Sequence, residues 1–267
     1  LLLQHYSDSQ VSQELFAIIA QLNLGLGLIE DQVERLDLAL LNLQAAQQAK
    51  QASVWDAALG YAYIGIELLS DSVGLCHRAW KTDYALSFDL HLMQVECEFL
   101  VSNHEQSKIL AEALLEQAHT PLEKAKICFL LASQQTALPL DYCISQSLAG
   151  LTYCGLKVPK IKQIDAALVQ QEYQALQSLL KQQSQVHLNK VVPDAISLAY
   201  RFFAQLAGTS QIAGQQDLYF YIVYKGLHTA LEHGPNEQAI ILYAMYGGAS
   251  AKQARYLEAS HSAKVAL

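Results

Sequence analysis

Residues 45–69 read AAQQAKQASVWDAALGYAYIGIELL, and this stretch decides the fold. A run of alanines ends at Ser53, and beyond it Trp55, Ala58, Ala62 and Gly65 recur at i, i+3, i+7 and i+10. That spacing puts them on one face of a helix packed against a neighbour. An aromatic residue followed three residues later by alanine predicts close helix approach, with the ring beside the small side chain. The stretch therefore predicts a packed helix hairpin rather than a catalytic motif.

The same spacing returns twice along the chain, with anchors at His104 and Leu140 that lie 49 and 36 residues after the preceding anchor. These intervals are close to the length of a tetratricopeptide repeat and its longer relatives. The pattern predicts an all-α fold, a tetratricopeptide-like antiparallel helix-hairpin superhelix (α-α solenoid). The expected packing signature consists of Trp55, Ala58, Ala62, Gly65, Ser107, Ala111, Cys143, Ser147 and Gly150.

Composition agrees with this class and excludes others. The 267 residues are 52% hydrophobic and 16% charged, and 13 Gly and 5 Pro are too few for a chain that turns as often as an all-β fold. The net charge of -8 would repel a phosphate backbone, so no nucleic acid is expected as partner. No apolar run reaches the ~18–20 residues of a membrane span. We expect a cytoplasmic protein, and the opening without Met suggests a piece of a longer chain.

The chain divides by pattern into two blocks. Residues 1–160 contain the repeat hairpins, the lysines near Pro159 form a linker, and 161–267 contain a continuing helical block whose last helix we expect to be cut short. Whether 193–267 continue the superhelix or form a separate cap stays open at this point, and we favour continuation.

Motifs for catalysis are absent from the sequence. The five cysteines (Cys76, Cys97, Cys128, Cys143 and Cys154) are widely spaced, which predicts buried free thiols rather than disulfides or a metal site. The nine histidines are isolated, except that His228 and His233 lie five residues apart, about 140° around a helix from one another. Phosphate-loop, kinase, nucleophile-elbow and HExxH signatures are missing. We therefore expect no catalytic residue, no metal and no cofactor in this segment, although the parent protein can be a kinase or ATPase.

Two surfaces are candidates for binding. In a stacked array the first helix of each hairpin lines the concave face, where a protein or peptide partner is expected to contact Gln47, Lys50, Glu96, Phe99, Cys128 and Gln135. The alternative is a small-molecule sensor that holds a ligand between helices of the aromatic-rich C-terminal block. Most of the aromatic residues in that block are nevertheless expected to be core: Tyr200, Phe202, Phe203, Tyr219, Phe220, Tyr221, Tyr224, Tyr243 and Tyr246.

Three stretches resemble a family of very large bacterial signalling proteins. Residues 41–59, LNLQAAQQAKQASVWDAAL, are similar to its LNLxAGxKAKxxxAYxAAL, with Trp55 where Tyr is usual. Residues 153–159, YCGLKVP, resemble its LLGVxLP, and residues 232–247, EHGPNEQAIILYAMYG, resemble xYGNSPxSAxAYAxYG. Such proteins join a protein-kinase-like domain, an AAA-type ATPase module, a tetratricopeptide-like helical region, a GAF sensor and a histidine-kinase or cyclase output. The resemblance implies a scaffold that couples such domains in signal transduction, and it transfers no catalytic residue.

Overall fold

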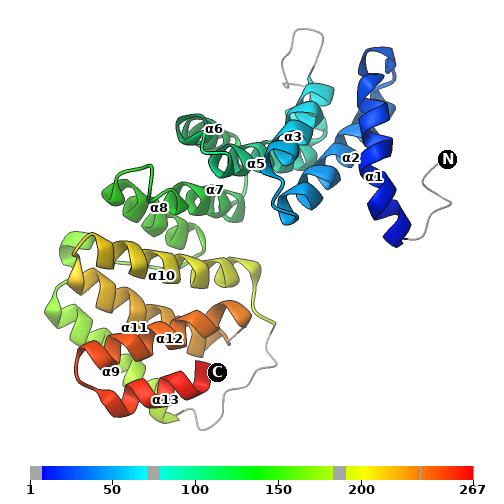
Figure 1. Cartoon of the computed structure of the whole chain (residues 1–267). Coiled ribbons are helices and arrows are strands. Elements are labelled where there is room, and N and C mark those ends of the chain that lie inside the picture. The colour runs from blue at the N-terminus through cyan, green and yellow to red at the C-terminus, as the bar shows by residue number, and fades with distance from the viewer. Residues whose placement is uncertain (1–7, 71–78, 183–190, 235, 267) are drawn as a thin grey trace. The chain divides into compact units, whose positions relative to one another are not determined.

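The structure of the 267-residue chain is a computed structural model, and it describes residues 8–70, 79–182, 191–234 and 236–266. Every regular element within these ranges is a helix (Figure 1). The α-helices are α1 (Asp8–Leu24), α2 (Gln32–Gln51), α3 (Trp55–Leu69), α4 (Ala79–Thr82), α5 (Tyr84–Leu100), α6 (His104–Gln117), α7 (Pro121–Ser133), α8 (Leu140–Tyr153), α9 (Ala166–Gln182), α10 (Asp194–Ile212), α11 (Gln216–His233), α12 (Ile240–Lys252) and α13 (Tyr256–Ala266). Three short 3₁₀ turns accompany them, η2 (Leu26–Leu28), η3 (Ile161–Gln163) and η4 (Glu237–Ala239). The predicted all-α fold of successive helix hairpins is confirmed.

The chain forms two compact units, Leu1–Ala118 and His119–Leu267. The first contains α1 to α6 and the second contains α7 to α13. The predicted division at residue 160 lies inside the second unit, between α8 and α9. The linker expected there ends in the short η3 turn, and beyond it α10 packs against α7 and α8 while α11 packs against α9.

Small side chains bring the helices of the first unit close together, as the pattern predicts. Ala58, Ala62 and Gly65 are buried on α3, which packs against α2 and α5. A Cβ at Gly65 would lie 2.5 Å from Leu90 Cδ2 on α5, so any larger residue would force the Leu90 side chain to shift. The next hairpin repeats the arrangement on α6, where the buried Ser107 hydroxyl donates to the Val95 carbonyl at 2.9 Å.

Trp55 departs from the prediction. It is the first residue of α3 and keeps 40% of its surface exposed, so its ring is not wedged into the helix contact. The reason is its position, because a residue at the helix end lies at the margin of the α2–α3 contact. The close approach of the two helices depends on the small residues that follow it.

Five helices end with the same hydrogen-bonded turn. The helices α2, α5, α8, α10 and α12 are each followed by a residue of positive φ, namely Ser53, Ser102, Gly155, Gly214 and Ala254. Around Ser53, its own N–H donates to the Lys50 carbonyl at 2.9 Å, and the Val54 N–H donates to the Ala49 carbonyl at 2.9 Å. The same 5→2 and 6→1 pair of bonds recurs at the other four turns, which is the Schellman motif. After α2, α5, α10 and α12 this turn leads into the next helix, which packs back on the helix before it.

The second unit has an aromatic core. All nine aromatic residues expected there are buried: Tyr200, Phe202, Phe203, Tyr219, Phe220, Tyr221, Tyr224, Tyr243 and Tyr246. Within the unit, α10 packs against α7, α8 and α11, while α11 also contacts α9 and α12. The helix α7 begins with a capping box in which Thr120 and Glu123 bond to each other's backbone N–H groups.

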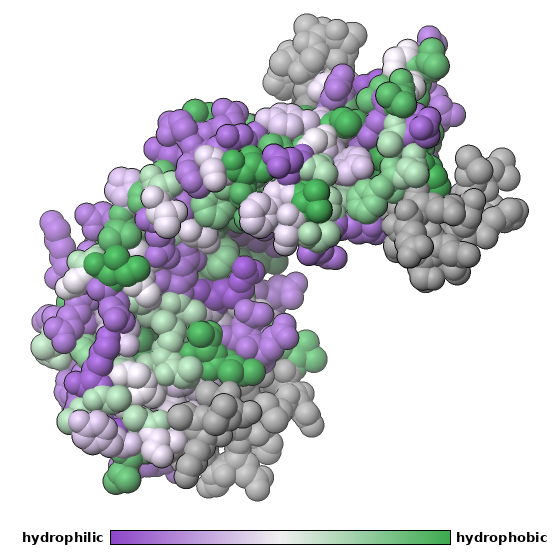
Figure 2. Space-filling model, in the orientation of Figure 1, coloured by the Kyte–Doolittle hydropathy of each residue, from purple (hydrophilic) through white to green (hydrophobic). Residues whose placement is uncertain are grey.

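The surface is mixed in character. Figure 2 shows hydrophilic and hydrophobic residues interspersed over the visible face of each unit. Where α1 joins α2, Leu24, Leu28 and Val33 are exposed. In the part of the chain that the structure describes, no helix has both the length and the apolar character needed to cross a membrane.

Candidate functional site

Four of the predicted partner-binding residues lie on α2 and α5 of the first unit. Lys50 on α2 and Glu96 on α5 form an ion pair, with 2.7 Å between Nζ and Oε2. Gln47 lies one turn before Lys50 and is exposed. Because α2 and α5 are the first helices of successive hairpins and are in contact, the structure brings these predicted residues together on neighbouring helices.

Phe99 lies one turn beyond Glu96 and is half-buried. Its ring centroid is 5.4 Å from that of His104, at the start of α6. Part of the Phe99 ring is therefore covered by the chain itself, and the remainder is accessible.

The last two predicted residues belong to the second unit. Cys128 is only 1% exposed, so its prediction as a surface residue is wrong. It shares a face of α7 with Ala125, Leu131 and Ala132, and this face packs against α8 and α10. Gln135 is partly exposed and lies in the turn after α7, which ends at Ser133.

The cysteines of the described chain are buried free thiols, as predicted. Burial raises the pKa of Cys97, Cys128 and Cys154 to about 11, which keeps each of them protonated at neutral pH. A protonated thiol is a poor nucleophile and a poor metal ligand. Cys76 lies outside the described residues. Among those residues, His, Cys, Asp and Glu side chains nowhere form a group of three that could hold a metal ion.

A buried carboxylate organises the α3–α5 contact on the side away from Lys50. Glu98 is almost fully buried and accepts hydrogen bonds from the Tyr63 hydroxyl and from Asn103 Nδ2, the latter at 2.7 Å. The hydrogen bond to Glu98 raises the pKa of Tyr63, and burial adds to the shift. The carboxylates of Glu96 and Glu98 thus have different surroundings on one helix, and each has a partner within the chain.

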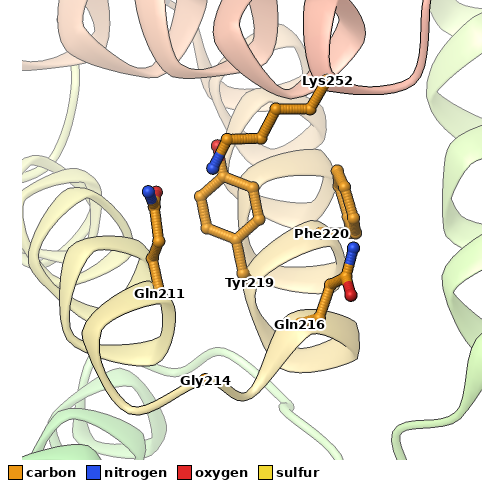
Figure 3. Close-up of a pocket in the computed structure, with 6 residues that line it drawn as sticks. All are labelled: Gln211, Gly214, Gln216, Tyr219, Phe220 and Lys252. Carbon is orange, nitrogen blue, oxygen red and sulfur yellow. The ribbon is translucent and has the colours of Figure 1, made fainter.

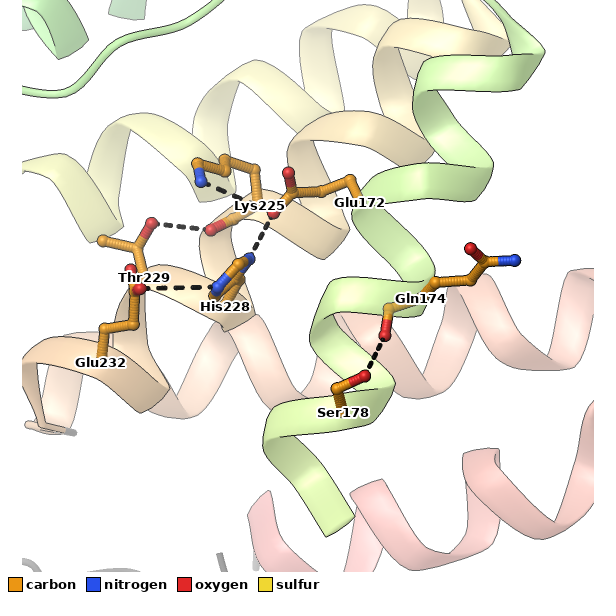
Figure 4. Close-up of polar contacts among 7 residues, drawn as sticks. All are labelled: Glu172, Gln174, Ser178, Lys225, His228, Thr229 and Glu232. Carbon is orange, nitrogen blue, oxygen red and sulfur yellow. Dashed lines mark hydrogen bonds and ion pairs between the residues drawn. The ribbon is translucent and has the colours of Figure 1, made fainter. Parts of the chain in front are cut away.

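A second polar cluster joins α9 to α11 (Figure 4). His228 Nδ1 lies 2.5 Å from Glu172 Oε1, and His228 Nε2 lies 3.6 Å from Glu232 Oε1. Lys225 Nζ approaches the same Glu172 oxygen at 3.6 Å. The Nδ1 contact with Glu172 therefore joins α9 to α11, whereas Glu232 lies on the same helix as His228. Sequence spacing could not reveal it, because Glu172 is 56 residues from His228.

The helices α9, α12 and α13 meet around Glu258. Its carboxylate accepts hydrogen bonds from the hydroxyls of Tyr173 and Tyr246, each at 2.7 Å. The guanidinium of Arg255 lies 3.7 Å from the ring centroid of Tyr173. Burial and the bond to Glu258 raise the pKa of Tyr173 to about 12, and the pKa of Tyr246 is raised by the same causes. This network anchors α13 to the second unit.

The second unit also contains a cavity of about 240 Å³, shown in Figure 3. Its floor is formed by the buried rings of Tyr219 and Phe220 on α11. Its rim consists of exposed residues from the end of α10, the following turn, the start of α11 and the end of α12: Gln211, Gly214, Gln216 and Lys252. Lys252 Nζ lies 4.5 Å from the Tyr219 ring centroid, a cation–π contact. The aromatic residues of this block could be recognised in the sequence, but this grouping could not, because three helices create it.

Comparison with known proteins gives one relationship that bears on function. The chain is 30% identical over 146 residues to the Hybrid signal transduction histidine kinase G of Dictyostelium discoideum. The match spans 53% of this chain and 4% of that protein. No family model matches the chain, and no solved structure matches it. The similarity associates this helical chain with signal-transduction proteins.

Proposed function

We propose that the chain is a non-catalytic helical-repeat module that binds a protein or peptide and couples the parts of a signal-transduction protein. The observation that carries this proposal is the similarity to a signal transduction histidine kinase, of which the matched region is a small fraction. The resemblance to large bacterial signalling chains, read from residues 41–59, 153–159 and 232–247, points to the same context. The partner is expected to be another domain of the same parent chain, in the cytoplasm.

The α2–α5 surface of the first unit supports a binding role. Gln47, Lys50, Glu96 and Phe99 place an amide, a cation, an anion and part of an aromatic ring on adjacent helices. Helical repeats bind peptides and helices with such mixed surfaces. The Lys50–Glu96 pair is partly exposed, so each charge can also bond to a partner.

The buried polar clusters support a structural rather than a catalytic use of the chain. The carboxylates of Glu98, Glu172 and Glu258 accept hydrogen bonds or ion pairs from neighbouring helices. Each therefore positions one helix on another. Rigid helix-to-helix contacts are what a coupling module needs to transmit a displacement.

Site-specific cross-linking tests the proposed surface. A photoreactive amino acid is placed at Gln47 in the full-length protein that contains this chain, and the cross-linked peptides are mapped. The control position is Glu116, which is exposed on α6 of the same unit. We expect position 47 to cross-link to one defined segment and Phe99→Asp to reduce that product severalfold. Equal labelling from positions 47 and 116, or a product unchanged by Phe99→Asp, would contradict the proposal.

A second candidate function is a small-molecule sensor in the second unit. The cavity between α10, α11 and α12 is the observation that favours it, because it combines an aromatic floor with a few polar groups at its rim. Ligand binding there would change the contacts of three helices together.

A further inference from the structure

We infer that the cavity at the α10–α11 turn binds a small planar organic anion, a single-ring aromatic carboxylate by chemical class. This inference rests on the second candidate function and specifies its ligand. The carrying observation is the combination of one cation, two aromatic rings and two amide side chains around one cavity (Figure 3).

The size of the cavity limits the ligand. Its volume of about 240 Å³ is below the range of about 300–1,000 Å³ typical of drug-sized ligands. It corresponds to about eight water molecules at their share of about 30 Å³ each in the liquid. A single ring with one small substituent fits this space, whereas a nucleotide does not.

The charge at the rim of the cavity favours a ligand of negative charge. Among the described residues that line the cavity, Lys252 carries the one formal charge and none is a carboxylate. The ammonium of Lys252 is held over the Tyr219 ring and forms no ion pair with the described residues. An anionic group beside it gains a charge-assisted hydrogen bond without breaking an existing ion pair. This local cation contrasts with the net charge of -8 of the whole chain.

The floor and the amides select a flat ring. Tyr219 and Phe220 lie with their ring centroids 5.2 Å apart, and the small exposed part of each ring gives the cavity an apolar floor that the ring of a ligand can touch. Gln211 and Gln216 lie on opposite sides of the Tyr219 ring in Figure 3, and each amide can donate and accept. The carbonyls at the end of α10 do not repel an anion strongly, because the Ala213 and Gly214 N–H groups already bond to Thr209 and Gln211.

Amide NMR titration of the whole chain tests the inference, with sodium benzoate as the probe. Benzamide is the matched neutral compound, and sodium chloride controls for ionic strength. We expect benzoate to shift the Gly214 amide and the side-chain amides of Gln211 and Gln216 saturably, and benzamide to bind severalfold more weakly. Lys252→Gln should weaken benzoate binding about tenfold, equivalent to about 1.4 kcal/mol. The spectrum itself shows whether each variant is folded.

Lys181→Gln is the control variant. It removes the same charge from an exposed position at the end of α9 in the same unit, and it should leave benzoate binding unchanged. Equal binding of benzamide and benzoate, or equal effects of the two lysine variants, would overturn the inference that the ligand is an anion. The proposal that the cavity binds a small molecule would still stand. Absence of shifts at these amides with either compound overturns the ligand site itself. Neither result depends on the cross-linking test at Gln47. A failure of the ligand site and a failure of the proposed interaction module can therefore be told apart.

Discussion

Gly150 on α8 lies directly beneath the ring of Phe202 on α10. A Cβ at residue 150 would be 2.0 Å from Phe202 Cζ and within 2.6 Å of both Cε atoms. Phe202 is fully buried and cannot retreat freely, since its ring also packs edge-on against Phe129 at 5.2 Å. A glycine of the predicted packing signature thus makes room for a buried aromatic ring of the neighbouring helix.

This contact predicts that Gly150→Ala destabilises the second unit by about 1–3 kcal/mol, the usual cost of overpacking a core. Urea unfolding followed by circular dichroism measures the change. Gly208→Ala on α10 is the matched control, because its added methyl meets nothing within 4 Å. The control should gain up to about 1 kcal/mol from the higher helix propensity of alanine. Equal effects of the two variants would show that the Phe202 contact does not limit residue 150.

The five Schellman turns give a second prediction. Ser53, Ser102 and Ala254 adopt a left-handed conformation that glycine adopts at the equivalent Gly155 and Gly214. A side chain in this region costs roughly 1–2 kcal/mol per residue. Ser53→Gly and Ala254→Gly should therefore raise the free energy of unfolding by about 0.5–1 kcal/mol, the remainder being offset by the entropy of glycine in the unfolded chain.

Gly155→Ala should have the opposite effect in the same urea assay. It introduces a Cβ at a φ of 85°, although there is open space around it. A loss of stability there therefore reports the backbone conformation and not a clash. Stabilisation of Gly155→Ala would refute this account of the turns.

The Lys50–Glu96 pair predicts a modest coupling between α2 and α5. Its side chains are 27% and 32% exposed, so solvent screens the attraction. A double-mutant cycle with Lys50→Ala and Glu96→Ala should give a coupling energy of about 0.2–1 kcal/mol that falls in high salt. A coupling energy that is independent of salt would indicate packing of the two side chains instead of an ion pair.

Alkaline pH should destabilise the second unit through its buried and half-buried tyrosines. Burial raises the pKa of Tyr173, Tyr200 and Tyr221 from 10.0 to about 12, so the folded state favours the neutral phenol. Their contribution to stability is complete below pH 10 and is lost as the pH rises through about 12. The midpoint of urea unfolding should therefore fall across this interval, and ultraviolet absorbance should show phenol ionisation at the same pH.

Glu258→Gln shows how much of the raised tyrosine pKa values comes from the Glu258 carboxylate and how much comes from burial. The substitution removes the carboxylate that bonds to Tyr173 and Tyr246, so the pKa of both phenols should fall toward the ordinary value. Tyr200 serves as the internal control, because its hydroxyl bonds to the Gly234 carbonyl instead. A titration curve identical to that of the native chain would show that burial alone sets these values.

The buried thiols predict slow modification of the folded chain. In a Cys76→Ser background, Ellman's reagent at neutral pH should react slowly with Cys97, Cys128, Cys143 and Cys154, because they are buried and their pKa values are raised. After unfolding in guanidinium, all four thiols should react quickly with the reagent. Rapid reaction of one thiol in the folded chain would contradict the prediction and would show that the structure around that thiol opens to solvent.

The sequence by itself determined the fold class and much of the packing. The i, i+3, i+7, i+10 spacing depends only on helix geometry, so Ala58, Ala62, Gly65, Ser107 and Ala111 could be placed on buried faces without coordinates. Local chemistry likewise accounts for the cap at Thr120 and the left-handed residue Gly155 after α8, where the interacting atoms are a few residues apart.

Tertiary structure decided which polar groups meet and which residues remain exposed. The exposure of Trp55 and the burial of Cys128 depend on where the helix contact ends and on which neighbours cover α7. Glu172 with His228, Glu258 with Tyr173, and the cavity beside Lys252 each combine helices that are far apart in the chain. Helical periodicity assigns a residue to a face of its own helix, but only the packing of helices assigns that face a neighbour.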